Sequence, residues 1–141
     1  MAIKQISVFA ENRHGSIYEI TSVLEKENID IKALSIADTS DYGILRMIVN
    51  DTDKAYAALK KAGMTVKVNE VLGVEIDDVP GGFSKIVKVL CDNNIDMSYT
   101  YAFLSPKERK ACVIIRVDNN TEAAAALLRA GVSLVSGDSI F

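Results

Sequence analysis

The chain has 141 residues, of which 49% are hydrophobic and 25% are charged, with two prolines and no tryptophan. This composition is typical of a folded globular protein and excludes general disorder. The formal net charge is −3, and no stretch concentrates Lys or Arg, which argues against a nucleic-acid-binding protein because such proteins neutralise phosphates with basic surfaces.

The first half of the chain predicts a strand, a helix, two strands, a helix and a strand. Alternating apolar residues indicate a strand over Ile3–Ala10, and a helix follows with one apolar face formed by Ile17, Ile20, Val23 and Leu24. Asn28 stands where this helix should end, since Asn tolerates the left-handed conformation. Strands are then expected at Ile31–Asp38 and Ile44–Asn50, joined by the turn-rich segment Thr39–Gly43.

A second helix should begin after a polar capping residue, Asp51 or Thr52, and end at Gly63. Its inner face is small and rich in alanine, so it can lie close to a sheet. The last strand of this half is expected at Met64–Val71.

The second half of the chain repeats the first. Residues Gly15 to Asp30 match Gly81 to Asp96 at a constant offset of 66, and Val49 to Gly63 match Val117 to Gly131 at an offset of 68. The added residues are best placed in the charged loop Ser105–Lys110, because loops tolerate insertion cheaply. The repeat predicts a cap at Asn119 or Asn120 and a last strand at Val132–Asp138.

The order β-α-β-β-α-β, found twice, predicts an α+β protein of two tandem ferredoxin-like units. Each unit should form an antiparallel sheet with both helices on one face, and we expect the two sheets to join side by side. The expected domains are residues 1–70 and 71–141, with almost no linker between them. Exposed sheet edges or faces would favour a homodimer.

The strand-to-helix turns and the segments after the helices resemble the ACT domain, a regulatory module of amino-acid-responsive enzymes. The turns read Glu11-Asn12-Arg13-His14-Gly15-Ser16-Ile17 and Asp77-Asp78-Val79-Pro80-Gly81-Gly82-Phe83, and Asn-Ile-Asp follows each helix. The resemblance covers the chain twice and is stronger in the second copy, which keeps Pro80 where the first has His14.

This resemblance implies that an amino acid binds at the interface between the two units. The implied binding residues are Asn12, Arg13, His14, Gly15 and Ser16 in the first turn, Asp78, Val79, Pro80, Gly81 and Gly82 in the second, and Asp30 and Asp96 at the second-strand starts. With pseudo-twofold pairing, Asn12 would face Asp96, and Asp78 would face Asp30. Because the two turns differ in charge, we expect two unequal sites.

General chemistry favours the same ligand class. Backbone N–H groups at a helix start suit a carboxylate, and an Asp or Asn oxygen suits an ammonium group. The glycines can also serve simply to make tight turns, the aspartates can be solvated strand residues, and Arg13 and His14 can be exposed turn residues.

Three other functions use the same topology, and of these the sequence leaves the first open. A ligand-free dimerising scaffold or a regulatory subunit acting through protein contacts fits the same fold. An acylphosphatase-like enzyme would need an Arg in the first turn and an Asn on a central strand, which Arg13 and Asn50 meet only in part. An RNA-binding module would need aromatic residues on Ile44–Asn50, which has none. We therefore expect no catalytic residues, no metal or cofactor, and a partner enzyme or regulator that responds to the ligand.

The cellular setting is also an expectation. Cys91 and Cys112 lie in apolar sequence and form no CxxC pair, so we expect reduced, buried thiols. The sequence Met1–Gln5 lacks a signal-peptide pattern, and no apolar run could span a bilayer. Together these features favour the cytoplasm and argue against a membrane partner.

Overall fold

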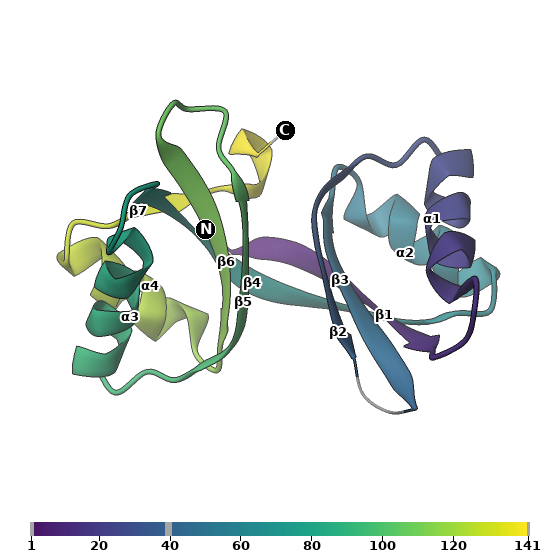
Figure 1. Ribbon diagram of the computed structural model, residues 1–141, viewed down its shortest axis with the longest axis horizontal. Helices are drawn as coiled ribbons and strands as arrows, with labels where there is room; N and C mark the ends of the chain where they lie inside the picture. Colours follow the sequence, from purple (N-terminus) through teal and green to yellow (C-terminus); the bar gives the residue numbers. More distant parts are fainter. Residues whose placement is uncertain (1, 39–40, 141) are drawn as a thin grey trace. The chain divides into compact units, whose positions relative to one another are not determined.

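The computed structural model describes residues 2–38 and 41–140. The chain divides into two compact units, an N-terminal unit of Lys4–Asn69 and a C-terminal unit of Glu70 onward, which also takes in the start of the chain up to Ile3. Each unit carries two helices on one side of its own sheet (Figure 1).

The N-terminal unit contains the predicted elements in the predicted order. They are the strands β1 (Ile3–Glu11), β2 (Ile31–Asp38), β3 (Tyr42–Val49) and the first part of β4 (Thr65–Asp77), with the helices α1 (Ser16–Lys26) and α2 (Thr52–Lys61). The strand order is β2-β3-β1-β4, and both β1 and β2 are antiparallel to β3. The turn predicted over Thr39–Gly43 lies in part outside the described residues, at Thr39 and Ser40, and β3 already begins at Tyr42.

The C-terminal unit repeats this arrangement. It contains the end of β4, the helix α3 (Gly82–Asp92), the strands β5 (Met97–Leu104) and β6 (Lys110–Val117), the helix α4 (Asn120–Arg129) and the short strand β7 (Ser133–Val135). Its strand order is β5-β6-β4-β7. The prediction of one strand over Val132–Asp138 is wrong at its end, because Gly137–Ser139 forms a 3-10 turn.

The two apolar cores use equivalent residues from the repeat. Ile20 and Leu24 of α1 pack with Leu59 of α2 in one core, and Ile86 and Leu90 of α3 occupy the same places in the other. This confirms the α+β class and the ferredoxin-like layering that the repeat predicted.

The helix ends follow from local chemistry. Asn28 and Asn94 adopt positive φ angles of 55° and 56° after α1 and α3, as the sequence predicted. The side chain of Asp51 accepts a hydrogen bond from the backbone N–H of Lys54, and Asn119 does the same for Glu122. These bonds satisfy donors that a helix start otherwise leaves unpaired.

Two sequence expectations are corrected. The last strand of the first repeat and the first strand of the second form one continuous strand, β4, rather than two strands with a short linker. Cys112 is buried as expected, but Cys91 is exposed because it lies on α3 away from the face that carries Ile86 and Leu90.

Candidate functional site

The first turn connects the end of β1 to the start of α1 through the four residues Asn12, Arg13, His14 and Gly15. Gly15 has a φ of 85°, a left-handed conformation that glycine adopts at little cost, and it caps α1. The Ser16 hydroxyl donates a hydrogen bond of 2.7 Å to the carbonyl oxygen of Glu11, and the Arg13 N–H donates to the same oxygen at 2.9 Å. These two hydrogen bonds join the start of the turn, at Glu11, to its middle and to the first residue of α1.

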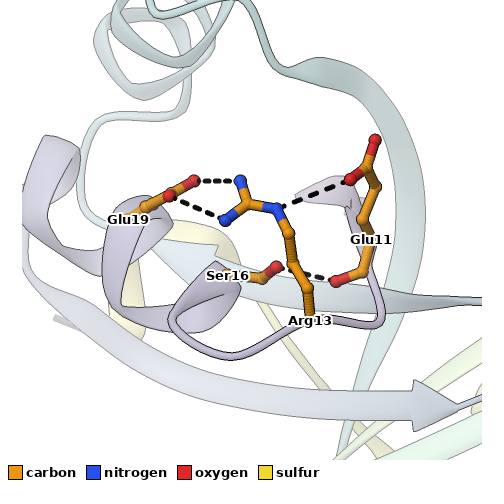
Figure 2. A network of polar contacts seen from close by, with 4 residues as sticks. All are labelled: Glu11, Arg13, Ser16 and Glu19. Atoms are coloured by element: carbon orange, nitrogen blue, oxygen red, sulfur yellow. Dashed lines mark hydrogen bonds and ion pairs between the residues drawn. The ribbon is translucent and has the colours of Figure 1, made fainter.

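Arg13 lies between two carboxylates at this turn (Figure 2). Its guanidinium donates through Nη1 and Nη2 to the two oxygens of Glu19, at 3.0 and 2.8 Å, and its Nε lies 3.5 Å from Glu11 Oε2. The hydrogen bond and charge of Glu19 raise the pKa of Arg13, and the hydrogen bond from Arg13 lowers the pKa of Glu19. Such a two-point pairing is geometrically specific, although its side chains are about half exposed.

A pocket of about 390 Å³ opens beside this ion pair, within the N-terminal unit. The Phe9 and Tyr42 rings form part of its wall, with centroids 6.3 Å apart and planes tilted by 52°. Its remaining lining is Ala10, Glu11, Arg13, Ser16, Glu19, Ile20, Ala62, Gly63, Met64 and Thr65. The volume is within the range of small-molecule sites, about 300–1,000 Å³.

The other residues predicted in the first turn lie outside the lining of this pocket. Asn12 faces the end of the β2–β3 hairpin, where its Nδ2 donates to Asp38 Oδ1 at 2.9 Å and its N–H donates to the Asp41 carbonyl at 3.3 Å. His14 is exposed in the turn. Of the first-turn residues, the structure thus brings Arg13 and Ser16 to the pocket.

Asp30 lies at the opposite end of the N-terminal unit from the first turn. Its N–H donates to Asn50 Oδ1 at 2.9 Å, and the Asn50 N–H donates to the Asp30 carbonyl at 3.1 Å. Because β1 and β2 run in the same direction beside β3, the end of β1 and the start of β2 are at opposite ends of the sheet. The same geometry separates Arg13 from Asn50, so an acylphosphatase-like pairing of these two residues within the unit is wrong.

The second turn has the same backbone but is tighter. Gly81 has a φ of 85°, the Asp78 N–H donates to the Arg109 carbonyl at 2.8 Å, and Val79 is exposed. A Cβ atom on Gly82 would lie 2.2 Å from the carbonyl oxygen of Asp77. Gly82 is therefore required by the close approach of two backbone segments, whereas its counterpart Ser16 carries a side chain.

A pocket occupies the equivalent place in the C-terminal unit, but it measures only about 130 Å³. Its chemistry differs because charged residues replace Phe9, Glu19 and Tyr42. These charged counterparts are Glu75, Lys85 and Lys110, in that order. The remaining lining is Ile76, Asp77, Gly82, Ile86, Gly131, Val132 and Ser133. Lys110 donates to Asp77, and this bond lowers the pKa of Asp77 and raises that of Lys110.

Asp96 lines a different pocket, of about 400 Å³, at the end of α3 where β5 begins. Asn94 and Cys91 lie in the same lining, together with apolar residues. As in the N-terminal unit, this end of the sheet is opposite to the turn, so Asp78 and Asp96 are not brought together within their unit.

Glu19, Phe9 and Tyr42 are residues that sequence reasoning missed. An acidic residue in the first turn of a helix is common because it complements the helix dipole, so Glu19 carried no signal by itself. The two repeats contain such a signal, because both members of the pair differ between them: Arg13 and Glu19 in the first repeat correspond to Val79 and Lys85 in the second.

The described residues contain no group of three or more His, Cys, Asp and Glu side chains placed to hold a metal ion. Within the same part of the chain, no helix is long and apolar enough to cross a membrane.

Comparisons with known proteins agree with this architecture. The chain is similar to the crystal structure of protein BT0572 from Bacteroides thetaiotaomicron, with 38% identity, a TM-score of 0.92, and coverage of 99% of this chain and 96% of that one. The regulatory subunits of aspartate kinase from Thermus thermophilus and Thermus flavus share the fold at 15% and 16% identity. Both have a TM-score of 0.63, with 90% and 91% of this chain and 91% and 92% of theirs covered.

A search of curated proteins found no matching sequence. A family model described as an ACT domain pair matches residues 1–140, nearly the whole chain. With two ferredoxin-like units and a glycine-capped turn in each, the chain belongs to the family of ACT domain pairs.

Proposed function

We propose that this protein is a regulatory module rather than an enzyme, and that it binds a free amino acid in the pocket beside Arg13. The observation that carries the proposal is the ion pair between Arg13 and Glu19, both of which line a pocket of about 390 Å³. The likeness of the fold to regulatory subunits of aspartate kinase supports a regulatory role.

An amino acid can enter this pair without leaving a charge uncompensated. Its carboxylate takes the place of the Glu19 carboxylate on the Arg13 guanidinium, and its ammonium group takes the place of the guanidinium beside Glu19. Glu11 can stay beside Arg13, because its Oε2 lies 3.5 Å from Nε on the side of the guanidinium away from Glu19 (Figure 2). Charge-assisted hydrogen bonds of this kind are stronger than neutral ones, which favours a zwitterion over a neutral molecule of the same size.

The walls of the pocket would select the ligand side chain. Phe9 and Tyr42 offer aromatic surfaces, and Ile20 and Met64 offer aliphatic ones. These groups favour an apolar side chain, because its burial removes apolar surface from water. Regulation follows if the ligand favours one conformation of the chain over another, which a partner enzyme or regulator then recognises.

Thermal unfolding in the presence of each of the twenty amino acids tests the proposal. A ligand at roughly 100-fold above its Kd stabilises the folded state by about 2.7 kcal/mol, which a melting curve resolves. Calorimetric titration of Arg13→Gln should then show at least tenfold weaker binding. Lys85→Gln, at the place equivalent to Glu19 in the C-terminal unit, is the matched control and should bind as the unmodified chain does.

The residues implied by the family resemblance are tested in the same titration. If Asn12 and Asp96 hold the ligand, Asn12→Ala and Asp96→Ala should each abolish the response while Arg13→Gln retains it. The opposite pattern supports the pocket beside Arg13. If no amino acid raises the melting temperature, the sensor proposal is refuted in favour of a ligand-free scaffold.

A further inference from the structure

The pocket beside the first turn is lined by two carboxylates and one guanidinium. They belong to Glu11, Glu19 and Arg13, and no other charged residue of the described chain is part of the lining. The lining therefore has a formal charge of −1. Because the single guanidinium is already paired, a ligand carboxylate can bind it only in competition with a carboxylate of the protein.

The two carboxylates contact different parts of the guanidinium (Figure 2). Glu11 Oε2 lies 3.5 Å from Arg13 Nε, whereas Glu19 accepts hydrogen bonds from both terminal nitrogens, Nη1 and Nη2, at 3.0 and 2.8 Å. The terminal nitrogens are the groups that an incoming carboxylate needs for a two-point contact. Glu19 is therefore the group that a ligand carboxylate displaces, while Glu11 can keep Arg13 oriented.

A displaced Glu19 carboxylate stays beside the pocket. The backbone of Glu19 is fixed in the first turn of α1, where its N–H donates to the Gly15 carbonyl at 3.0 Å. Its side chain is 50% exposed, so the carboxylate can turn away from Arg13 without leaving the lining. The group that comes to lie next to this carboxylate then decides whether the exchange is favourable.

We propose that Glu19 makes the site select a free amino acid over the 2-oxo acid with the same side chain, an inference that rests on the proposed function. An amino acid brings an ammonium group together with its carboxylate, so the displaced Glu19 gains a new partner. A 2-oxo acid brings the carboxylate alone. Its carboxylate and that of Glu19 then compete for the terminal nitrogens of Arg13, and the two like charges repel each other.

The charge of the occupied site expresses the same difference. With a zwitterion the lining and the ligand together keep a formal charge of −1, and with a 2-oxo acid they carry −2. A site that pairs with a polar group of its ligand rejects an analogue that lacks this group, because a polar group of the protein is left unpaired. Since water reaches half of Glu19, we expect a preference of about tenfold rather than the far larger factors of buried sites.

This preference gives the site a place relative to one class of reaction. A 2-oxo acid becomes an amino acid when a donor amine transfers its amino group to it, so the two molecules differ at the position that contacts Glu19. A site that responds to the amino acid and not to the 2-oxo acid reports the product of amino-group transfer and ignores the precursor.

Calorimetric titration with two matched pairs of compounds tests the inference. The pairs are leucine with α-ketoisocaproate and phenylalanine with phenylpyruvate, whose side chains suit the apolar walls. The unmodified chain should bind each amino acid about tenfold more tightly than its 2-oxo acid. Glu19→Gln keeps the size of the side chain and removes its charge, so this variant should lose the preference and bind the 2-oxo acids more tightly than the unmodified chain does. A gain in binding cannot result from misfolding.

Two further variants complete the experiment. Glu19→Lys introduces the residue of the second repeat and should bind the 2-oxo acids more tightly still, because it adds a cation beside Arg13. Lys85→Gln, the matched control in the C-terminal unit, should keep the preference of the unmodified chain. If the unmodified chain binds both members of a pair equally, or if Glu19→Gln keeps the preference, the inference fails and the proposed function stands. If neither leucine nor phenylalanine binds, the proposed function fails and the inference fails with it.

Discussion

Replacing Gly82 by alanine tests the close approach that shapes the second turn. The added Cβ atom would lie 2.2 Å from the carbonyl oxygen of Asp77 and 3.3 Å from its carbonyl carbon. The first distance is about 1 Å shorter than an ordinary carbon–oxygen contact, and the opposing atoms are backbone, which yields less easily than a side chain. Overpacking of this kind costs about 1–3 kcal/mol.

A Gly→Ala change also has a favourable part, because alanine has less freedom in the unfolded chain and a higher helix propensity. That gain is about 0.5–1 kcal/mol. The steric cost should win, so Gly82→Ala should destabilise the protein by about 1–2 kcal/mol. For a chain of this size, the melting temperature should fall by roughly 3–7 °C.

The repeat supplies the control for this experiment. Ser16 is the counterpart of Gly82, and it holds its side chain within the first turn by donating to the Glu11 carbonyl. Ser16→Ala should therefore cost only that hydrogen bond, about 1 kcal/mol. Urea unfolding of both variants measures the difference. If Gly82→Ala is as stable as the unmodified chain, the approach to Asp77 is not a packing constraint, and the glycine must be explained differently.

Two further predictions concern helix starts and acid stability. Asp51→Ala and Asn119→Ala should each lower the free energy of unfolding by about 1 kcal/mol in urea titrations, while Asp51→Asn should keep most of the cap. Glu19 and Asp77 have lowered pKa values in the folded protein, so the unfolded chain takes up their protons first as the pH falls. Their contribution to stability is complete above about pH 4.5 and is lost as the pH falls through the lowered folded pKa values, so a Glu19→Gln, Asp77→Asn variant should show a flatter acid limb of stability against pH.

The parts of the fold that follow local rules could be predicted from the sequence. Asn28 and Asn94 adopt the left-handed conformation after their helices, and Asn is one of the few residues that tolerate it. Asp51 and Asn119 cap helices because each side chain accepts a hydrogen bond from the backbone N–H three residues later. The duplication added independent support, since each element was seen twice. These features depend on residues that are only a few positions apart in the sequence.

The parts that depend on three-dimensional neighbours could not be predicted. The continuous strand β4 was missed because the end of one repeat and the start of the next look like two separate strands in the sequence. The exposure of Cys91 depends on which side of α3 faces the sheet, and its apolar neighbours in sequence gave the wrong answer. Arg13 was named as a site residue, but its pairing with Glu19 required the turn to fold back on the helix.

The two equivalent pockets show how a duplicated backbone can acquire different chemistry. The glycine-capped turns are nearly superimposable in φ, at 85° for both Gly15 and Gly81, so the backbone does not distinguish the units. The difference comes from side chains: the aromatic Tyr42 is replaced by Lys110, which reaches Asp77 and forms an ion pair across the smaller pocket.

Both pockets hold an ion pair, Arg13–Glu19 in the first and Lys110–Asp77 in the second, but the pockets differ in volume. In the N-terminal unit, Arg13 leaves a pocket of about 390 Å³ open beside its carboxylate partners, whereas the C-terminal pocket measures about 130 Å³. A ligand in the second pocket would have to separate Lys110 from Asp77 and also find room. Lys110→Tyr, which restores the residue of the first repeat, should remove that ion pair. Because Val79 and Lys85 also stand where the first repeat has Arg13 and Glu19, Lys110→Tyr alone should leave the stoichiometry of amino-acid binding unchanged in calorimetric titration. A second equivalent of bound amino acid would show instead that the Lys110–Asp77 ion pair alone closes the second pocket.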